Sequence, residues 1–152
     1  MPVVLGDTER DADRFRFTLA DDVVVVETAQ KLDTYLDAHP DEDLVVVGPD
    51  VSMAVATEVS ETYRLRRPFL GVVLLRRRME VSTMSEAIRA GIREVVLVSE
   101  NSSAYGKDLG TNLEHLLHGL DAVEGLDWIR VSDLQPAEVR PSLLETMLGL
   151  ER

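Results

Sequence analysis

The sequence predicts an α/β fold in which a parallel sheet carries helices on both faces. Short apolar runs rich in β-branched residues recur along the chain, and such continuous runs are typical of strands that are covered on both faces. Stretches with the helical spacing of apolar residues separate these runs. The order is therefore β-α repeated six times, and right-handed crossovers then arrange the strands in an open parallel sheet.

Six strands are expected from the apolar runs. They are residues 3–5, 23–26, 44–47, 70–75, 95–98 and 128–131. The first five consist mainly of valine and leucine, which is typical of strands that are buried on both faces of a sheet. The sixth run is weaker and is expected near an edge of the sheet, where the charges of Asp127 and Arg130 discourage pairing with another molecule.

Six helices are expected between and after these strands. They are residues 11–19, 28–39, 51–63, 82–90, 111–120 and 141–148. Thr28 is a helix cap and Pro40 stops the helix that follows it. Gly91 ends the fourth helix, and Pro141 suits the first turn of the last one. Asp50, in the turn after the third strand, is expected to cap the helix at 51–63.

Composition narrows the classes of function. The chain has 152 residues, a formal net charge of −12 and no cysteine. We expect one domain over residues 1–152, because no linker or low-complexity tract divides the chain. The negative charge argues against nucleic-acid binding, and no apolar run is long enough to cross a membrane. Without a leader or disulfides, a cytoplasmic location is expected.

Three stretches of the first two thirds of the chain carry a resemblance. They are "DEDLVVVGPDVSMAVA", "RPFLGVVLLRRR" and "AIRAGIREVV". On these, residues 1–98 resemble the receiver-like N-terminal domain of tight-adherence pilus-assembly ATPases. The resemblance implies a flavodoxin-like sheet of five strands, which the sixth β-α unit extends. It also implies a role in dimerisation and localisation.

The phosphorylation site of a working receiver is broken in this segment. Gly48 stands where the phosphoryl-accepting aspartate should end the third strand. Only Asp7 is present of the acidic pair that holds Mg²⁺, because Gly6 fills the neighbouring position. Leu75 and Val98 replace the hydroxyl and the lysine that pair with the phosphoryl group. The segment is therefore not expected to accept phosphate.

The last third of the chain resembles another family. The signatures "VSENSSAYGKDLG" and "IRVSDLQPAEVRP" make residues 86–148 similar to a fragment of a radical S-adenosylmethionine methylthiotransferase of the type that modifies a ribosomal-protein aspartate. The resemblance implies that Ser99, Glu100, Asn101 and Ser132 lie near the methionine part of the cofactor. The cysteines that would hold the family's iron–sulfur cluster are absent, so no cofactor is expected and this site is vestigial.

The two resemblances meet without a linker, between a receiver-like segment, 1–94, and a barrel-like segment, 95–152. The hypothesis that follows is an engineered chimera, spliced through a β-α element common to both parents. Its function is then that of a non-catalytic scaffold. The alternatives are a pseudo-receiver interaction module, which would form a homodimer, and a weak binder of S-adenosylmethionine or a small anion at the loop 99–110.

Two further patterns are interpreted without a site. His115 and His118 lie three apart on an expected helix, but zinc needs further ligands, and solvent-facing histidines are the simpler interpretation. Gly106, Lys107 and Gly110 lack the spacing of a phosphate-binding loop. No metal site is therefore predicted, and the chain is not expected to be an enzyme.

Overall fold

The computed structural model describes residues 2–7, 10, 23–77 and 81–151, which form two compact units. Unit 1 spans residues 1–91 and unit 2 spans residues 92–152. The expected helix at 11–19 lies outside the described residues. In the described part of the chain, no helix is long and apolar enough to cross a membrane.

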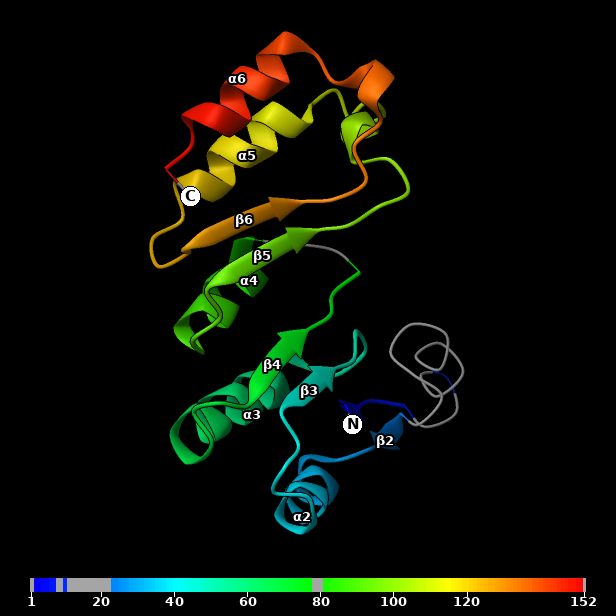
Figure 1. Cartoon of the computed structure of the whole chain (residues 1–152), viewed down its shortest axis with the longest axis vertical. Coiled ribbons are helices and arrows are strands. Elements are labelled where there is room, and N and C mark those ends of the chain that lie inside the picture. The colour runs from blue at the N-terminus through cyan, green and yellow to red at the C-terminus, as the bar shows by residue number, and fades with distance from the viewer. Residues whose placement is uncertain (1, 8–9, 11–22, 78–80, 152) are drawn as a thin grey trace. The chain divides into compact units, whose positions relative to one another are not determined.

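Unit 1 is built on a four-stranded parallel sheet (Figure 1). Its strands are β1 (Val3–Leu5), β2 (Val24–Val26), β3 (Leu44–Val47) and β4 (Gly71–Leu74), and its described helices are α2 (Ala29–Ala38), α3 (Met53–Arg66) and α4 (Val81–Arg89). The strand order is β2-β1-β3-β4, the order with which flavodoxin-like sheets begin. The α/β prediction is therefore confirmed.

The core of unit 1 lies between one face of this sheet and the helices α2 and α3. Val3, Leu5, Val45 and Val47 point into it from the two central strands, and all four are fully buried. The helices contribute apolar stripes: Leu32, Leu36, Ala56, Val59 and Tyr63. Burial of these side chains against the central strands is the main source of stability of the unit.

Of the two predicted N-terminal helix caps, the structure confirms the one at Thr28 and contradicts the one at Asp50. Thr28 caps α2 as predicted, because its hydroxyl accepts a hydrogen bond from Lys31 N at 3.2 Å. The cap of α3 is Ser52, whose hydroxyl accepts from Val55 N at 3.3 Å, and not Asp50. The prediction for Asp50 was wrong because its carboxylate pairs with Arg77 instead.

Unit 2 contains two strands, β5 (Glu94–Leu97) and β6 (Trp128–Val131), and two helices, α5 (Leu113–Asp121) and α6 (Pro141–Gly149). Short 3₁₀ turns lie at Ser102–Ala104 and Pro136–Glu138. Figure 1 shows β5 and β6 side by side, with α5 and α6 to one side of them. Leu113, Leu117 and Leu143 form the buried centre between helices and strands.

The predicted count of strands in one sheet was wrong. Five strands and a sixth were expected in a single sheet, whereas four form one sheet and β5 pairs with β6 in another. The side chains of β5 explain this. Val95 and Leu97 are covered while Glu94 and Val96 are exposed, and Leu97 packs on the helices that follow β5 in the sequence. Leu97 thus has its buried partners within unit 2.

Removing the hydroxyl of Tyr63 is expected to change the pH dependence of stability. The buried Tyr63 hydroxyl donates a hydrogen bond to Asp33 Oδ1. Burial, and then this hydrogen bond, raise the pKa of Tyr63 well above its ordinary value. The neutral phenol therefore stabilises the fold fully below about pH 10, where tyrosine ionises in the unfolded chain, and this contribution is lost as the pH rises further.

Tyr63→Phe should therefore cost about 1.5–3 kcal/mol at neutral pH, the range for a hydrogen bond to a charged group. It should also show a shallower loss of stability above about pH 10. Urea denaturation of both proteins across this pH range measures the two effects. Because the other tyrosines titrate in both proteins, identical slopes above pH 10 would show that Tyr63 is not the titrating group.

Candidate functional site

The carboxyl edge of the four-stranded sheet brings together the residues that follow β1, β3 and β4. Backbone hydrogen bonds extend the ladder by one residue at each strand: Gly6 N donates to Val26 O, Gly48 N to Leu5 O and Leu75 N to Val47 O, at 2.8–2.9 Å. Open α/β sheets bind ligands at this edge. Gly48 therefore lies directly at the end of β3, where the sequence placed it.

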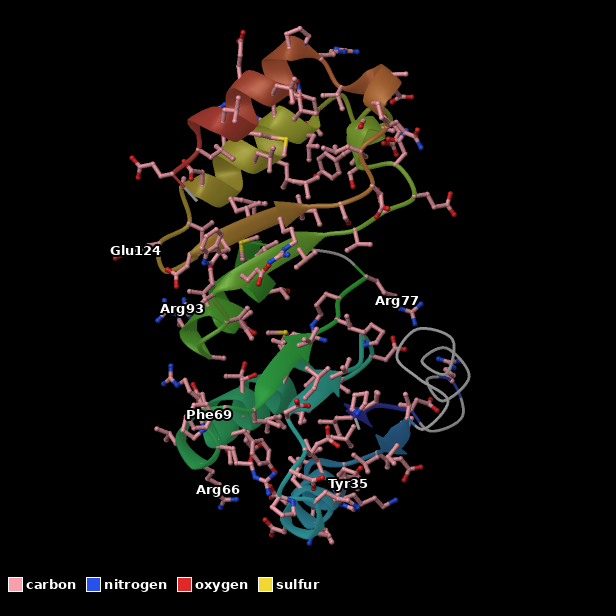
Figure 2. The ribbon with its side chains drawn as sticks, viewed as in Figure 1. Tyr35, Arg66, Phe69, Arg77, Arg93 and Glu124 are labelled. Carbon is pink, nitrogen blue, oxygen red and sulfur yellow. The ribbon has the colours of Figure 1, made fainter. Side chains whose placement is uncertain are left out.

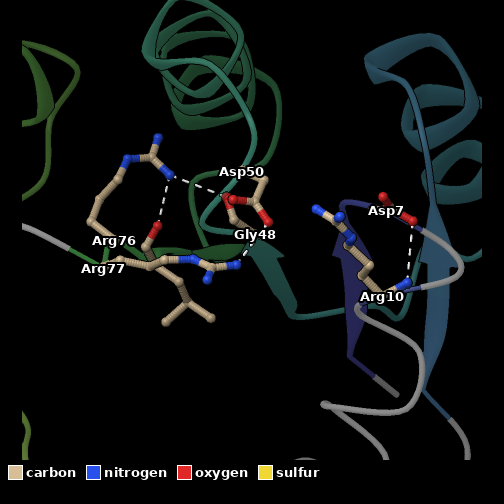
Figure 3. Close-up of polar contacts among 7 residues, drawn as sticks. Asp7, Arg10, Gly48, Asp50, Arg76 and Arg77 are labelled. Carbon is tan, nitrogen blue, oxygen red and sulfur yellow. Dashed lines mark hydrogen bonds and ion pairs between the residues drawn. The ribbon is translucent and has the colours of Figure 1, made fainter.

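A single guanidinium joins the ends of β3 and β4 (Figure 3). Arg76 Nη1 donates to Gly48 O at 3.1 Å and to Leu75 O at 2.7 Å. Its Nε and Nη2 lie 3.1 and 3.0 Å from Met53 Sδ, in the first turn of α3. Burial lowers the pKa of Arg76. The end of β3, where the receiver resemblance predicts the phosphoryl-accepting residue, is thus contacted by a guanidinium that is already hydrogen-bonded.

The acidic side chains at this edge are also engaged (Figure 3). Asp50 Oδ2 forms an ion pair with Arg77 Nη2 at 3.0 Å, and both side chains are about half exposed. Asp7 Oδ1 accepts a hydrogen bond from Arg10 N at 3.2 Å. Among the described residues, no group of three acidic or histidine side chains could hold a metal ion. This edge therefore does not fit the magnesium site of a receiver.

In unit 2, the predicted ligand-binding residues lie at the carboxyl ends of two adjacent strands. Ser99 follows β5, and Ser132 follows β6. The Ser132 hydroxyl donates to Leu97 O at 3.0 Å, while the Ser99 hydroxyl lies 3.1 Å from that of Ser102. Ser102 N donates to Asp133 O at 3.0 Å and ties the two loops together. The structure thus brings these serines to one edge, with their hydroxyls already in hydrogen bonds.

The other two predicted residues behave differently. Glu100 is exposed. Asn101 Nδ2 donates to Glu138 Oε2 at 3.4 Å, and Lys107 Nζ donates to the same oxygen at 2.7 Å. The Lys107 ammonium, followed by the Asn101 amide, lowers the pKa of Glu138. Asn101 Oδ1 is buried and has no hydrogen-bond partner, so one acceptor of this loop is left unsatisfied.

Two functional features were missed in the sequence. The contacts of Arg76 could not be predicted because Arg76 lies in a run of arginines, and such a run suggests a basic surface patch. The bridge from Lys107 to Glu138 joins residues 31 positions apart, and nothing local signals such a pair. His115 and His118 lie on α5 as expected. Among the residues that the structure describes, they belong to no group of three side chains that could hold a metal ion.

Comparison with known proteins identifies relatives of part of the chain. Three are named ribosomal protein uS12 methylthiotransferase RimO. The protein of Cutibacterium acnes is 62% identical over 64 residues, that of Salinispora tropica 61% over 61, and that of Streptomyces coelicolor 50% over 64. These matches cover 39–41% of this chain but only 12–13% of the length of each relative. They confirm the resemblance to methylthiotransferases for a segment of this size.

No family model matches the chain. No solved structure matches it either. The resemblance of residues 1–98 to receiver-like domains stays a prediction.

Proposed function

We propose that this chain is a non-catalytic α/β scaffold that combines a receiver-like unit with a fragment of a radical S-adenosylmethionine enzyme. The observation that carries the proposal is the contact of Arg76 with Gly48. A phosphoryl-accepting site needs a carboxylate at the end of β3 and a metal beside it. Here a glycine carbonyl stands at that position and accepts a hydrogen bond from a guanidinium.

Unit 2 supports the same proposal from its chemistry. Radical S-adenosylmethionine enzymes hold an iron–sulfur cluster on cysteine thiolates, and this chain contains no cysteine. Two parallel strands also cannot close a barrel. The loops at the ends of β5 and β6 hydrogen-bond to one another, which favours a folded connection over a working cofactor site.

The chimeric origin is part of the proposal. The division into compact units falls between residues 91 and 92, inside the β-α element that both resemblances share. Recombination at a shared element would preserve the local structure of each parent, because both use the same right-handed β-α unit. The presence of this open reading frame in the genome of a natural organism would contradict an engineered origin. The cytoplasmic location stays a prediction.

The second candidate is weak binding of S-adenosylmethionine or a small anion by the loop 99–110. The observation that favours it is Asn101 Oδ1, a buried acceptor without a partner, because a buried acceptor gains from any donor that reaches it. The donor available on the methionine part of that molecule is its ammonium group. Calorimetry with S-adenosylmethionine decides this candidate, with Asn101→Leu as the matched variant.

The experiment for the main proposal uses the full chain. We expect no gain of a phosphoryl group by mass spectrometry after incubation with acetyl phosphate and Mg²⁺, and no turnover of S-adenosylmethionine. Gly48→Asp is the informative variant, because it restores the acceptor but leaves Arg76 in place. A phosphorylated parent chain, or any product from S-adenosylmethionine, would overturn the proposal.

A further inference from the structure

Two donors from the loop after β5 converge on one carboxylate oxygen within unit 2. Lys107 Nζ lies 2.7 Å and Asn101 Nδ2 lies 3.4 Å from Glu138 Oε2. Glu138 belongs to the 3₁₀ turn that follows β6. Figure 2 shows the loops after β5 and β6 at the opposite end of these strands from Arg93 and Glu124, which precede them. Because a hydrogen bond from a cation to a carboxylate is a strong one, the loop presents an arrangement that can bind a small anion.

The surroundings of the Glu138 carboxylate favour a negative charge at its position. The hydrogen bond from Lys107, followed by the one from Asn101, lowers the pKa of Glu138. The positive charge of Arg140 acts in the same direction. Acidic side chains such as Glu100 belong to the same loop, yet the net result is still a lowered pKa. The two cations and the amide therefore outweigh the acidic side chains at this position.

The orientation of the Asn101 amide also fits an anion at this position. Its Oδ1 is buried and finds no hydrogen-bond partner in the described part of the chain, whereas its Nδ2 faces Glu138. Turning the amide over would bury the nitrogen and place Oδ1 against the carboxylate, and both of these oxygens are acceptors. Asn101 therefore presents its donor to the carboxylate, although a buried acceptor is left unsatisfied.

The segment that carries Glu138 holds its side chain beside the loop. Gln135 N donates to Ser103 Oγ at 3.0 Å, and Glu138 N donates to Gln135 O at 2.9 Å. These bonds keep the carboxylate at a high effective concentration beside Lys107. The side chains of Lys107 and Glu138 are 56% and 39% exposed, and an ion pair with this exposure contributes little to stability. Glu138 can therefore be replaced without unfolding unit 2.

We propose that Lys107 and Asn101 form a binding site for a small carboxylic acid, and that the chain's own Glu138 occupies this site and competes with an acid from solution. The contact of Glu138 is thus autoinhibitory. It reduces the apparent affinity for a free acid by the fraction of molecules in which the site is vacant. This inference rests on the second candidate function, the binding of a small anion by the loop 99–110. It deepens that function, because it names a carboxylate as the ligand and Glu138 as its competitor.

An acetate titration of the full chain, followed by NMR, tests the proposal. In Glu138→Ala, the amide signals of residues 99–107 should shift and saturate as sodium acetate is added, with sodium chloride at equal ionic strength as the reference. The affinity should be about tenfold higher than in the parent, which corresponds to a site that Glu138 occupies about nine tenths of the time. Glu138→Gln keeps the size of the side chain and removes its charge, so it should also bind acetate more tightly than the parent. Saturation in neither variant, or an affinity equal to that of the parent, overturns the proposal.

Two further variants locate the site, in proteins that keep the parent spectrum outside the loop. Glu100→Ala removes the same charge from the same loop but leaves Glu138 in place, so it should bind acetate no more tightly than the parent. Adding Lys107→Met to Glu138→Ala should abolish the saturating shifts, because it removes the ammonium donor. Tighter binding in Glu100→Ala would mean that net charge alone sets the affinity, and unchanged binding in the double variant would mean that Lys107 does not form the site. Either result overturns the proposal.

The outcome is independent of the experiments on the proposed functions. The phosphorylation and turnover assays test the non-catalytic assignment, and calorimetry with S-adenosylmethionine tests the binding of that molecule. A chain that binds no acetate can therefore fail here and still be non-catalytic.

Discussion

Gly106→Ala is expected to destabilise unit 2 by roughly 2–6 kcal/mol. Gly106 has φ +76°, in the left-handed region, where a non-glycine residue costs about 1–3 kcal/mol. An added Cβ would also lie 2.5 Å from Thr111 Cγ2 and 2.7 and 2.8 Å from the Thr111 carbonyl atoms. The backbone cannot easily give way, because Gly106 O accepts hydrogen bonds from Leu109 N and Thr111 N. Overpacking of this kind adds about 1–3 kcal/mol.

Gly110→Ala is the matched control for this prediction. Gly110 has φ +69° in the same loop, but nothing lies within 4 Å of its added Cβ. It should therefore cost only the free energy of the left-handed backbone conformation, about 1–3 kcal/mol. Urea denaturation followed by the fluorescence of Trp128, the single tryptophan of the chain, reports on unit 2. Equal losses in the two variants would show that the close approach to Thr111 is not what makes glycine necessary at position 106.

Local sequence patterns were sufficient to predict most of the elements. The buried strands β1 and β3 are continuous valine and leucine runs, and their composition identifies them without tertiary information. The cap at Thr28 was also predicted, because a threonine before an apolar-periodic segment is a local signal. The start of α3 was not predicted correctly. Asp50 and Ser52 are both good caps, and the choice depends on Arg77, which is distant in the sequence.

The sequence alone could not predict which strands pair with one another. An apolar run shows that β5 is a strand, but not which neighbour it hydrogen-bonds to. The outcome depended on side chains beyond the run: Glu94 Oε1 pairs with Arg130 at 2.7 Å across β5 and β6, and Leu97 packs against the leucines of α5 and α6. The same limit applies to the sites. Gly48 was placed correctly at its strand end, whereas the hydrogen bond from Arg76 that covers it needed three-dimensional structure.

Leu117→Ala should reduce the stability of unit 2 by about 2–5 kcal/mol, the range for removing a buried leucine. Leu117 is 1% exposed and lies with Leu113 and Leu143 at the centre of this small core. The unit has two strands covered by helices on one side, so few other side chains can move in to fill the space. The lost side chain therefore leaves a cavity as well as losing its own transfer free energy.

Leu148→Ala on α6 separates burial from helix propensity in this test. Leu148 is 87% exposed, and alanine is at least as good a helix former as leucine. Its stability should change by less than about 0.5 kcal/mol, as is usual at the surface. Hydrogen exchange should show faster exchange in α5, α6, β5 and β6 for Leu117→Ala and no change for Leu148→Ala. Equal effects of the two substitutions would mean that the helices do not pack on β5 and β6 through Leu117, because only a buried contact makes the two leucines differ.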